Sequence, residues 1–173
     1  MIKIALGALL AGAVLFLAAC GGDGGSQAAH SGAGGATVAV SSVKPVGDVL
    51  VDSAGKTLYT SDVEASGKIL CTGACKSFWK PLEPGMGKPS ATGDAGKLAV
   101  IDRPDGTEQV TANGRPLYTF AEDGRGEAKG NGFSDDFAGR HFVWNAVAAG
   151  GMPASTSGSS TGSGDGYPGG GGY

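Results

Sequence analysis

The feature that most constrains this chain is a stretch of ten residues that occurs twice. Residues 51–60 read VDSAGKTLYT, and residues 110–119 read VTANGRPLYT. In each copy a turn of small residues and glycine precedes a basic residue and Leu-Tyr-Thr, and the chain then runs on to a tryptophan, Trp79 in the first copy and Trp144 in the second. Short apolar runs separated by such turns are typical of β-hairpins. The pattern therefore predicts a duplicated small β unit.

Glycine marks the limits of this unit. The chain has 173 residues and 34 glycines, which are concentrated in residues 21–36 and from residue 150 onwards. Segments rich in Gly and Ser with few apolar groups cannot offset the entropy of ordering. We therefore predict a flexible tether at 21–36, one folded domain at 37–149 and a disordered Gly/Ser-rich tail at 150–173. A domain of this length has room for one modest core.

The domain is expected to be mainly β. Residues 37–43, 46–52, 56–60, 98–101, 107–111, 115–120 and 140–147 show strand patterns, and Asn113-Gly114 is a strong hairpin signal. The fold class predicted is a small antiparallel β domain from two degenerate repeats, with at most one short helical turn near residues 74–79. Residues 83–96 and 121–139 are rich in turn-forming residues and predict loops.

The first twenty residues have the pattern of an export signal. Lys3 supplies a positive charge, residues 4–17 are apolar, and Leu17-Ala18-Ala19-Cys20 follows. This is a signal peptide ending in a lipobox, typical of bacterial lipoprotein precursors. We expect Cys20 to carry the lipid and the membrane to be a partner through that lipid. Because Gly21 is not Asp, the pattern predicts the outer membrane in a Gram-negative host.

Charge and motifs exclude several classes of function. The formal net charge is −3 and no basic run or stripe occurs, so the sequence predicts no nucleic-acid binding. No serine nucleophile sits in a recognisable elbow, and the carboxylates mostly lie beside glycine in turns, as in Pro104-Asp105-Gly106. Asp135-Asp136 could cap a helical turn or bind a cation, and a hydrolase centred on 121–139 is a weaker alternative. We expect a protein that is not an enzyme.

Cys71 and Cys75 are the cysteines that remain once Cys20 is acylated. In an exported protein such a pair is expected to form a disulfide, and Gly73 permits the tight turn. The alternative is a redox or copper site of Cys71, Cys75 and His141, with Met86 as a further soft ligand. Metal and cofactor are expected to be absent on the first interpretation, and copper is expected on the second.

Four aromatic residues recur at matching places in the two copies: Tyr59, Tyr118, Trp79 and Trp144. Such residues are interpreted first as core aromatics and second as an exposed patch for a partner.

These motifs resemble a known family. The sequence resembles the bacterial lipoproteins called "secreted repeat of unknown function", which carry a Tyr-x-(Phe/Trp/Tyr)-x-x-Asp motif. The motifs that carry the resemblance are, in chain order, Gly-x-Thr-Leu-Tyr, Cys-x-x-x-Cys, Trp-x-Pro-Leu and Gly-x-Pro-Leu-Tyr-x-Phe-x-x-Asp. The resemblance covers residues 46–148 and the lipobox. Tyr118, Phe120 and Asp123 match the motif in full. In the first copy, Tyr59 is followed by Ser61 in place of the aromatic, and Asp62 comes too early.

The resemblance implies a location and a repeat architecture and no activity. One physical hypothesis is that Tyr118 and Phe120 pack inward while Asp123 accepts backbone N–H groups, which would make the motif a structural clasp. The function expected is a lipid-anchored envelope protein, non-enzymatic, acting as a binding or structural module for a protein or small-molecule partner that the sequence does not identify. The alternative is a redox or copper-handling lipoprotein.

Overall fold

The computed structural model describes residues 34–155. The protein is mainly β, with 45% strand and 6% helix, which confirms the predicted fold class. Within the described residues the helical elements are the single turns η1 (Asp62–Glu64) and α1 (Cys75–Phe78), so the short turn predicted near 74–79 is present. No helix in this part of the chain is both long and apolar enough to cross a bilayer. The predicted signal peptide, its Cys20, most of the tether and most of the tail lie outside the described residues.

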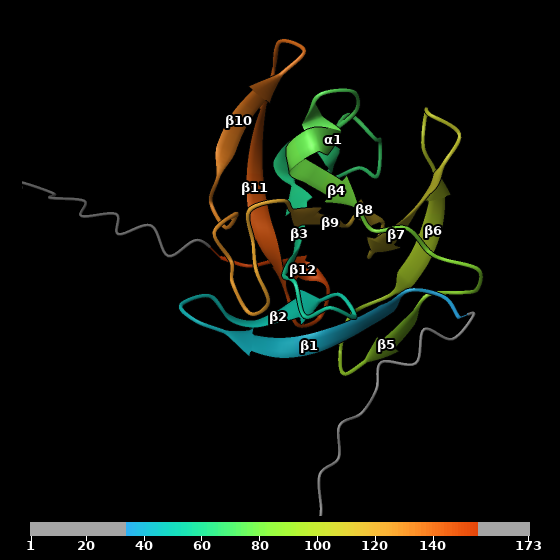
Figure 1. Ribbon diagram of the computed structural model, residues 1–173, viewed down its shortest axis with the longest axis vertical. Coiled ribbons are helices and arrows are strands. Elements are labelled where there is room, and N and C mark those ends of the chain that lie inside the picture. The colour runs from blue at the N-terminus through green and yellow to red at the C-terminus, as the bar shows by residue number, and fades with distance from the viewer. Residues whose placement is uncertain (1–33, 156–173) are drawn as a thin grey trace, which may run out of the picture. The chain divides into compact units, whose positions relative to one another are not determined.

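The strands form two sheets (Figure 1). The larger sheet has the order β4-β9-β3-β11-β2-β1-β5, with β10 and β12 each paired to β11, and the smaller has the order β6-β7-β8. All strand pairs are antiparallel except the parallel pair of β1 and β5. The strands are β1 (Thr37–Val43), β2 (Gly47–Val51), β3 (Leu58–Ser61), β4 (Trp79–Pro81), β5 (Ser90–Thr92), β6 (Leu98–Asp102), β7 (Glu108–Ala112), β8 (Arg115–Pro116), β9 (Tyr118–Phe120), β10 (Ser134–Phe137), β11 (Arg140–Ala148) and β12 (Met152–Pro153).

The two copies of the repeat are interlocked at the centre of the larger sheet. Strands β3 and β9 hold the two Leu-Tyr-Thr segments and pair with each other, which places Tyr59 opposite Tyr118. The tryptophan strand of the first copy, β4, then pairs with β9 of the second, and β11 of the second pairs with β3 of the first. Each repeat therefore completes its sheet with a strand of the other.

The sequence of the turns explains the local hairpins. Asn113 and Gly114 both have positive φ, +48° and +79°, the backbone that a two-residue turn between twisted strands requires. In the first copy the equivalent turn is held by Asp52, whose carboxylate accepts the N–H groups of Ala54 and Lys56, each at 2.9 Å. The second turn joins the paired strands β7 and β8, whereas across the first turn β2 and β3 share only a single bridge between Val51 and Thr57.

Two segments predicted as loops contain strands. Strand β5 lies within 83–96 and pairs with β1, and β10 lies within 121–139 and pairs with β11. Neither segment has a hydrophobic alternation of its own, because β5 is fully exposed and β10 has exposed Ser134 and Asp136 on one face. Their strand structure comes from the neighbouring strand, so local patterns could not predict it.

The domain also extends beyond both predicted ends. At the N-terminus Ala36 donates its N–H to Pro84 O at 2.7 Å and accepts from Ser90 N at 2.9 Å, so the end of the predicted tether is paired. At the C-terminus β12 pairs with β11, and Ala154 packs into the core at 9% exposure. The predicted start of the tail at 150 was therefore wrong, since backbone pairing with β11 compensates for the low hydrophobicity of this segment.

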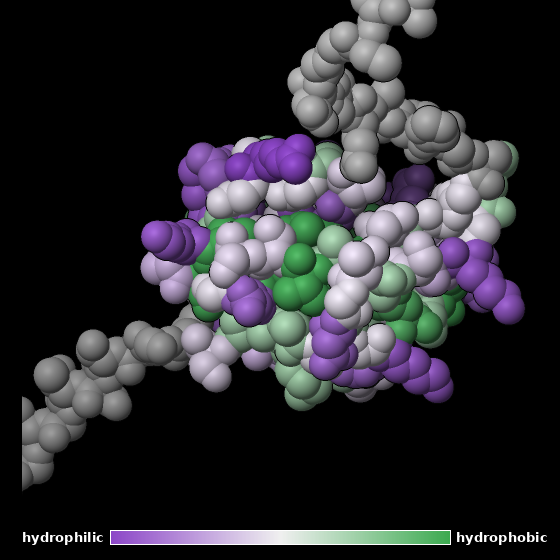
Figure 2. Space-filling model, turned by 90° about the horizontal axis from the view of Figure 1, so that it is seen from below, coloured by the Kyte–Doolittle hydropathy of each residue, from purple (hydrophilic) through white to green (hydrophobic). Residues whose placement is uncertain are grey.

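The core consists of two clusters of buried residues. The first gathers the aromatic residues with the two cysteines around β3, β4, β9 and β11. The second is aliphatic and includes Val38, Leu50, Leu58, Val110 and Leu117. Figure 2 shows the molecule from below, where apolar residues come to the surface near the middle of the view and hydrophilic residues surround them. The aromatic cluster holds the residues of the sequence motif.

Candidate functional site

The aromatic residues of the two repeats stack on one another. Trp79 and Trp144 lie parallel, with ring centroids 4.0 Å apart and an angle of 11° between their planes. Phe120 stacks on Trp79 at 4.5 Å, and Phe142 stacks on Trp144 at 5.6 Å. Both tryptophans have no exposed surface. Of the two interpretations of these aromatics, core packing describes them, because the four recurring residues offer no surface to a partner.

Tyr59 of the first copy is held by Asp123 of the second. The Tyr59 hydroxyl donates to Asp123 Oδ2 at 2.5 Å, and Asp123 Oδ1 accepts the N–H of Lys129 at 2.9 Å. Asp123 is 4% exposed and Tyr59 is fully buried. Burial and then the hydrogen bond to the Asp123 carboxylate raise the pKa of Tyr59 far above its ordinary value. Asp123 thus accepts a backbone N–H, as hypothesised from the sequence, and also a tyrosine that the sequence did not point to.

The corresponding acid of the first copy is Glu64. It follows Tyr59 by the same interval at which Asp123 follows Tyr118, and it is fully buried. Its Oε1 accepts the N–H groups of Leu70 at 2.5 Å and Cys71 at 2.7 Å. The prediction that the first copy has its acid too early, at Asp62, was wrong. Asp62 instead accepts the N–H of Val143 at 2.9 Å.

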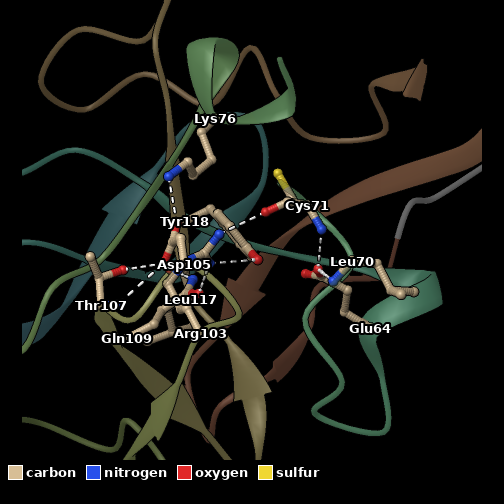
Figure 3. Close-up of polar contacts among 10 residues, drawn as sticks. All are labelled: Glu64, Leu70, Cys71, Lys76, Arg103, Asp105, Thr107, Gln109, Leu117 and Tyr118. Atoms are coloured by element: carbon tan, nitrogen blue, oxygen red, sulfur yellow. Dashed lines mark hydrogen bonds and ion pairs between the residues drawn. The ribbon is translucent and has the colours of Figure 1, made fainter. Parts of the chain in front are cut away.

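Tyr118 lies between Glu64 and a buried arginine (Figure 3). Burial and then the charge of the Glu64 carboxylate raise the pKa of Tyr118 above its ordinary value. Arg103, 3% exposed, donates to the Tyr118 hydroxyl at 3.4 Å, to Cys71 O at 2.7 Å and to the side-chain oxygen of Gln109. Each tyrosine of the motif is therefore set beside an acid of the other repeat.

Sequence reasoning missed both Glu64 and Arg103. A signal for Glu64 was present, because the interval from tyrosine to acid is equal in the two copies. Arg103-Pro104-x-Gly106 likewise corresponds to Lys44-Pro45-x-Gly47. That correspondence could not have identified a buried cation, since Lys44 is exposed and Arg103 is buried.

The predicted disulfide is present. Cys71 and Cys75 are bonded, with their Cα atoms 5.3 Å apart, and both are fully buried. The bond closes the loop that precedes α1 and leads into Trp79. The backbone of Cys71 is also held from both sides, because its N–H donates to Glu64 and its carbonyl accepts from Arg103. This segment is thus fixed by a covalent bond and by two buried charged groups.

The alternative copper ligands are not brought together. His141 is exposed on β11, where its Nδ1 lies 3.2 Å from Asp136 Oδ1, and Met86 is 83% exposed. Among residues 34–155, no three or more His, Cys, Asp or Glu side chains are grouped so that they could hold a metal ion. The cysteines are bonded to each other instead.

Asp135 binds both stacked tryptophans. Its Oδ2 accepts the indole N–H of Trp79 at 2.8 Å, and its Oδ1 accepts that of Trp144 at 3.0 Å. The sequence interpretation of Asp135 as a helix cap or cation ligand missed this arrangement, because β10 is a strand and because both tryptophans come from other strands. A buried indole N–H needs an acceptor, and Asp135 supplies one to each repeat.

These contacts together define a class of protein: a mainly β domain of two repeats joined by exchanged strands, stacked tryptophans and buried tyrosine–carboxylate pairs. Residues 99–148 match the family described as "Secreted repeat of unknown function", which confirms the resemblance inferred from the sequence. This range contains Tyr118, Phe120, Asp123 and Trp144, whereas the first copy lies outside it. The comparisons with curated proteins and with solved structures gave no match.

Proposed function

We propose that this protein is a lipid-anchored protein of the bacterial envelope and that its β domain is a non-enzymatic binding module. The observation that carries the proposal is the burial of the motif. Tyr118, Phe120 and Asp123 are each at most 4% exposed, and the polar side-chain groups of Tyr118 and Asp123 are bonded to Arg103, to Tyr59 and to the backbone N–H of Lys129. A catalytic group must reach a substrate, so a motif buried in this way supports a structural role.

The lipid anchor is supported by the sequence of the leader. A short apolar run ends in Leu17-Ala18-Ala19-Cys20, and the description of the matched family refers to a secreted repeat. In this proposal Cys20 carries the lipid, the following glycine-rich residues separate the lipid from the domain, and the domain presents its surface to a partner. The tyrosine–carboxylate pairs and the disulfide keep that surface rigid, which lowers the entropic cost of binding.

The test of the anchor is expression of the full precursor in a bacterial host, with Cys20→Ser as the matched variant. We expect the wild-type protein in the membrane fraction with a mass increased by a diacylglyceryl group and acyl chain, and the variant in the soluble fraction or the medium. Equal fractionation of the two proteins, or a mature mass without lipid, would contradict the anchor.

The non-enzymatic binding role and the copper alternative are separated by mass spectrometry of the purified protein. We expect the native protein to resist thiol alkylation and to gain no mass with Cu(I). Ready alkylation, together with uptake of one copper that His141→Ala weakens, would favour metal handling and reject the proposal.

A further inference from the structure

The hairpin of β10 and β11 carries an aromatic surface that the domain leaves open. Strand β10 pairs with β11 along one edge and has no strand partner along its other edge within the described residues. Figure 1 shows this hairpin at the periphery of the domain, with β10 on its outer side. Phe133 immediately before the strand is 42% exposed, and Phe78 of α1 is 46% exposed. We call Phe78, Phe133, Asp135 and Phe137 the β10 surface.

The alternation of the strand puts the main residues of this surface on one face. Phe133, Asp135 and Phe137 are two residues apart, so their side chains point to the same side of the hairpin. Phe133 lies 5.3 Å from Phe120 and 6.2 Å from Trp79, measured between ring centroids, and Phe137 lies 6.2 Å from Phe78. The β10 surface is therefore the exposed margin of the aromatic core, with one carboxylate between two phenylalanines.

The carboxylate of Asp135 has no cationic partner in the described part of the chain. The ion pairs found there join Lys76 and Arg103 to Asp105 and Lys129 to Glu127, and His141 lies beside Asp136. The contacts of Asp135 are instead two neutral indole N–H groups, one on each oxygen. A carboxylate has about four acceptor positions, so both oxygens keep capacity for a further donor. Asp135 is partly exposed, and its negative charge is uncompensated at an aromatic surface.

We propose that the β10 surface binds an extended segment of a partner protein that carries lysine or arginine between two apolar residues. The segment adds a strand to the free edge of β10 through main-chain hydrogen bonds, as in β-strand addition. In such a pair, directly opposite side chains on one face have Cβ atoms about 4.5–5.5 Å apart. A basic residue opposite Asp135 then reaches the carboxylate, and the residues two positions away contact Phe133 and Phe137.

The negative charge of Asp135 decides which kind of partner segment the β10 surface binds. A purely apolar segment would leave Asp135 unpaired next to a desolvated interface, and an acidic segment would add repulsion. Two copies of β10 paired with each other would also bring together the acidic residues of both. A basic residue supplies both the charge and the donors, and the adjacent phenyl rings add a cation–π contribution. This inference deepens the proposed binding function by naming the surface and the chemistry of the partner.

The test uses the full chain, isotopically labelled, and three synthetic peptides observed by NMR. The peptides are acetyl-TVTKTVT-amide and its variants with glutamine or glutamate in place of lysine. We expect the lysine peptide to shift the amide signals of β10 and of Phe78 and Phe133, and to bind about tenfold more tightly than the glutamine peptide, which corresponds to one charge pair of about 1.4 kcal/mol. Higher salt should reduce this difference.

The matched variants are Asp135→Asn and Asp136→Asn, which remove neighbouring charges from opposite faces of β10. We expect the first to weaken binding of the lysine peptide about tenfold and the second less than twofold. Absence of shifts at β10 at millimolar peptide, equal binding of the lysine and glutamine peptides, or equal effects of the two variants would each overturn the inference. The peptide series on the wild-type protein decides alone if Asp135→Asn fails to fold. Lipid anchoring is tested separately at Cys20, so failure here leaves that part of the proposed function standing.

Discussion

At the scale of single residues, the motif acts through buried polar contacts. The pair of Tyr59 and Asp123 joins the two repeats by a hydrogen bond of 2.5 Å between two buried side chains. A charged acceptor makes such a bond stronger than a neutral pair, and loss of one partner leaves the other buried and unpaired. Gly130 packs against the side-chain rings of Trp79 and Tyr59. A Cβ atom at this position would come within 2.9 Å of Trp79 and 3.0 Å of Tyr59, so the site has no room for a larger residue.

We predict that Tyr59→Phe lowers the free energy of unfolding by about 1–3 kcal/mol, and that Asp123→Ala lowers it by a similar amount. The two residues share one hydrogen bond, so their effects should not add. We expect the double variant to lower the free energy of unfolding by less than the sum of the two single effects, with a difference of at least about 1 kcal/mol. Urea unfolding of the four proteins measures this coupling. Ser61→Ala is the control, since the Ser61 hydroxyl is buried without a hydrogen-bond partner and its removal should change stability little. Additive losses would show that the pair does not act as a unit.

The same tyrosines predict an alkaline limit to stability. In the folded protein the pKa of Tyr59 and the pKa of Tyr118 lie above the value of 10.0 expected for exposed tyrosine. Burial is the larger cause, and the adjacent carboxylate is the second. The unfolded chain therefore loses these protons first, so stability is kept below about pH 10 and falls above it. Each tyrosine contributes about 1.4 kcal/mol per pH unit to this fall. Unfolding titrations between pH 8 and pH 11 should show a shallower decline for Tyr59→Phe, and identical declines would refute the assignment.

At the scale of elements, the segment from η1 to β4 is held at several points. Glu64 binds the N–H of Cys71, Arg103 binds its carbonyl, and the disulfide to Cys75 closes the loop before Trp79. Lys76 in α1 also pairs with Asp105 at 2.5 Å, and this pair, with the hydrogen bonds from Thr107, lowers the pKa of Asp105. The disulfide is thus one of several restraints on this segment.

We predict that replacing both Cys71 and Cys75 with alanine lowers the free energy of unfolding by about 2 kcal/mol, because a loop this short gains little entropy when it is opened. The variant should still fold cooperatively, since the contacts of Glu64 and Arg103 remain. Circular dichroism during urea unfolding measures both the free energy of unfolding and the cooperativity of the transition. A variant without a cooperative transition would show instead that the disulfide is required for folding.

The elements also show how far the sequence predicts the structure. The repeated stretch, the hairpin turn at Asn113-Gly114 and the Cys71–Cys75 bond depend on local chemistry and were predicted. Strands β5, β10 and β12 lack a hydrophobic pattern of their own and form by pairing with β1 or β11, so they were missed. The exchange of partners between repeats and the acceptance of both indoles by Asp135 arise from residues distant in sequence. Glu64 was also missed, although the interval from tyrosine to acid is equal in the two copies and could have identified it.

At the scale of the whole molecule, the central claim is that the two repeats form one folding unit. Strands β4 and β11 each pair with a strand of the other repeat, and the aromatic core is shared by both. A half containing 34–93 would lack β9 and β11, and a half containing 94–155 would lack β3 and β4. Neither half could bury its own tryptophan or satisfy its own tyrosine.

The most direct test is circular dichroism with thermal unfolding of these two halves, alone and mixed in equal amounts. We predict that each half alone has no cooperative transition, because its sheet is incomplete and its indole lacks the stacked partner. The mixture should recover the β spectrum and a single transition that shifts to higher temperature as the concentration increases. A cooperative transition in either half alone would contradict the account, because it would mean that one repeat folds without the other.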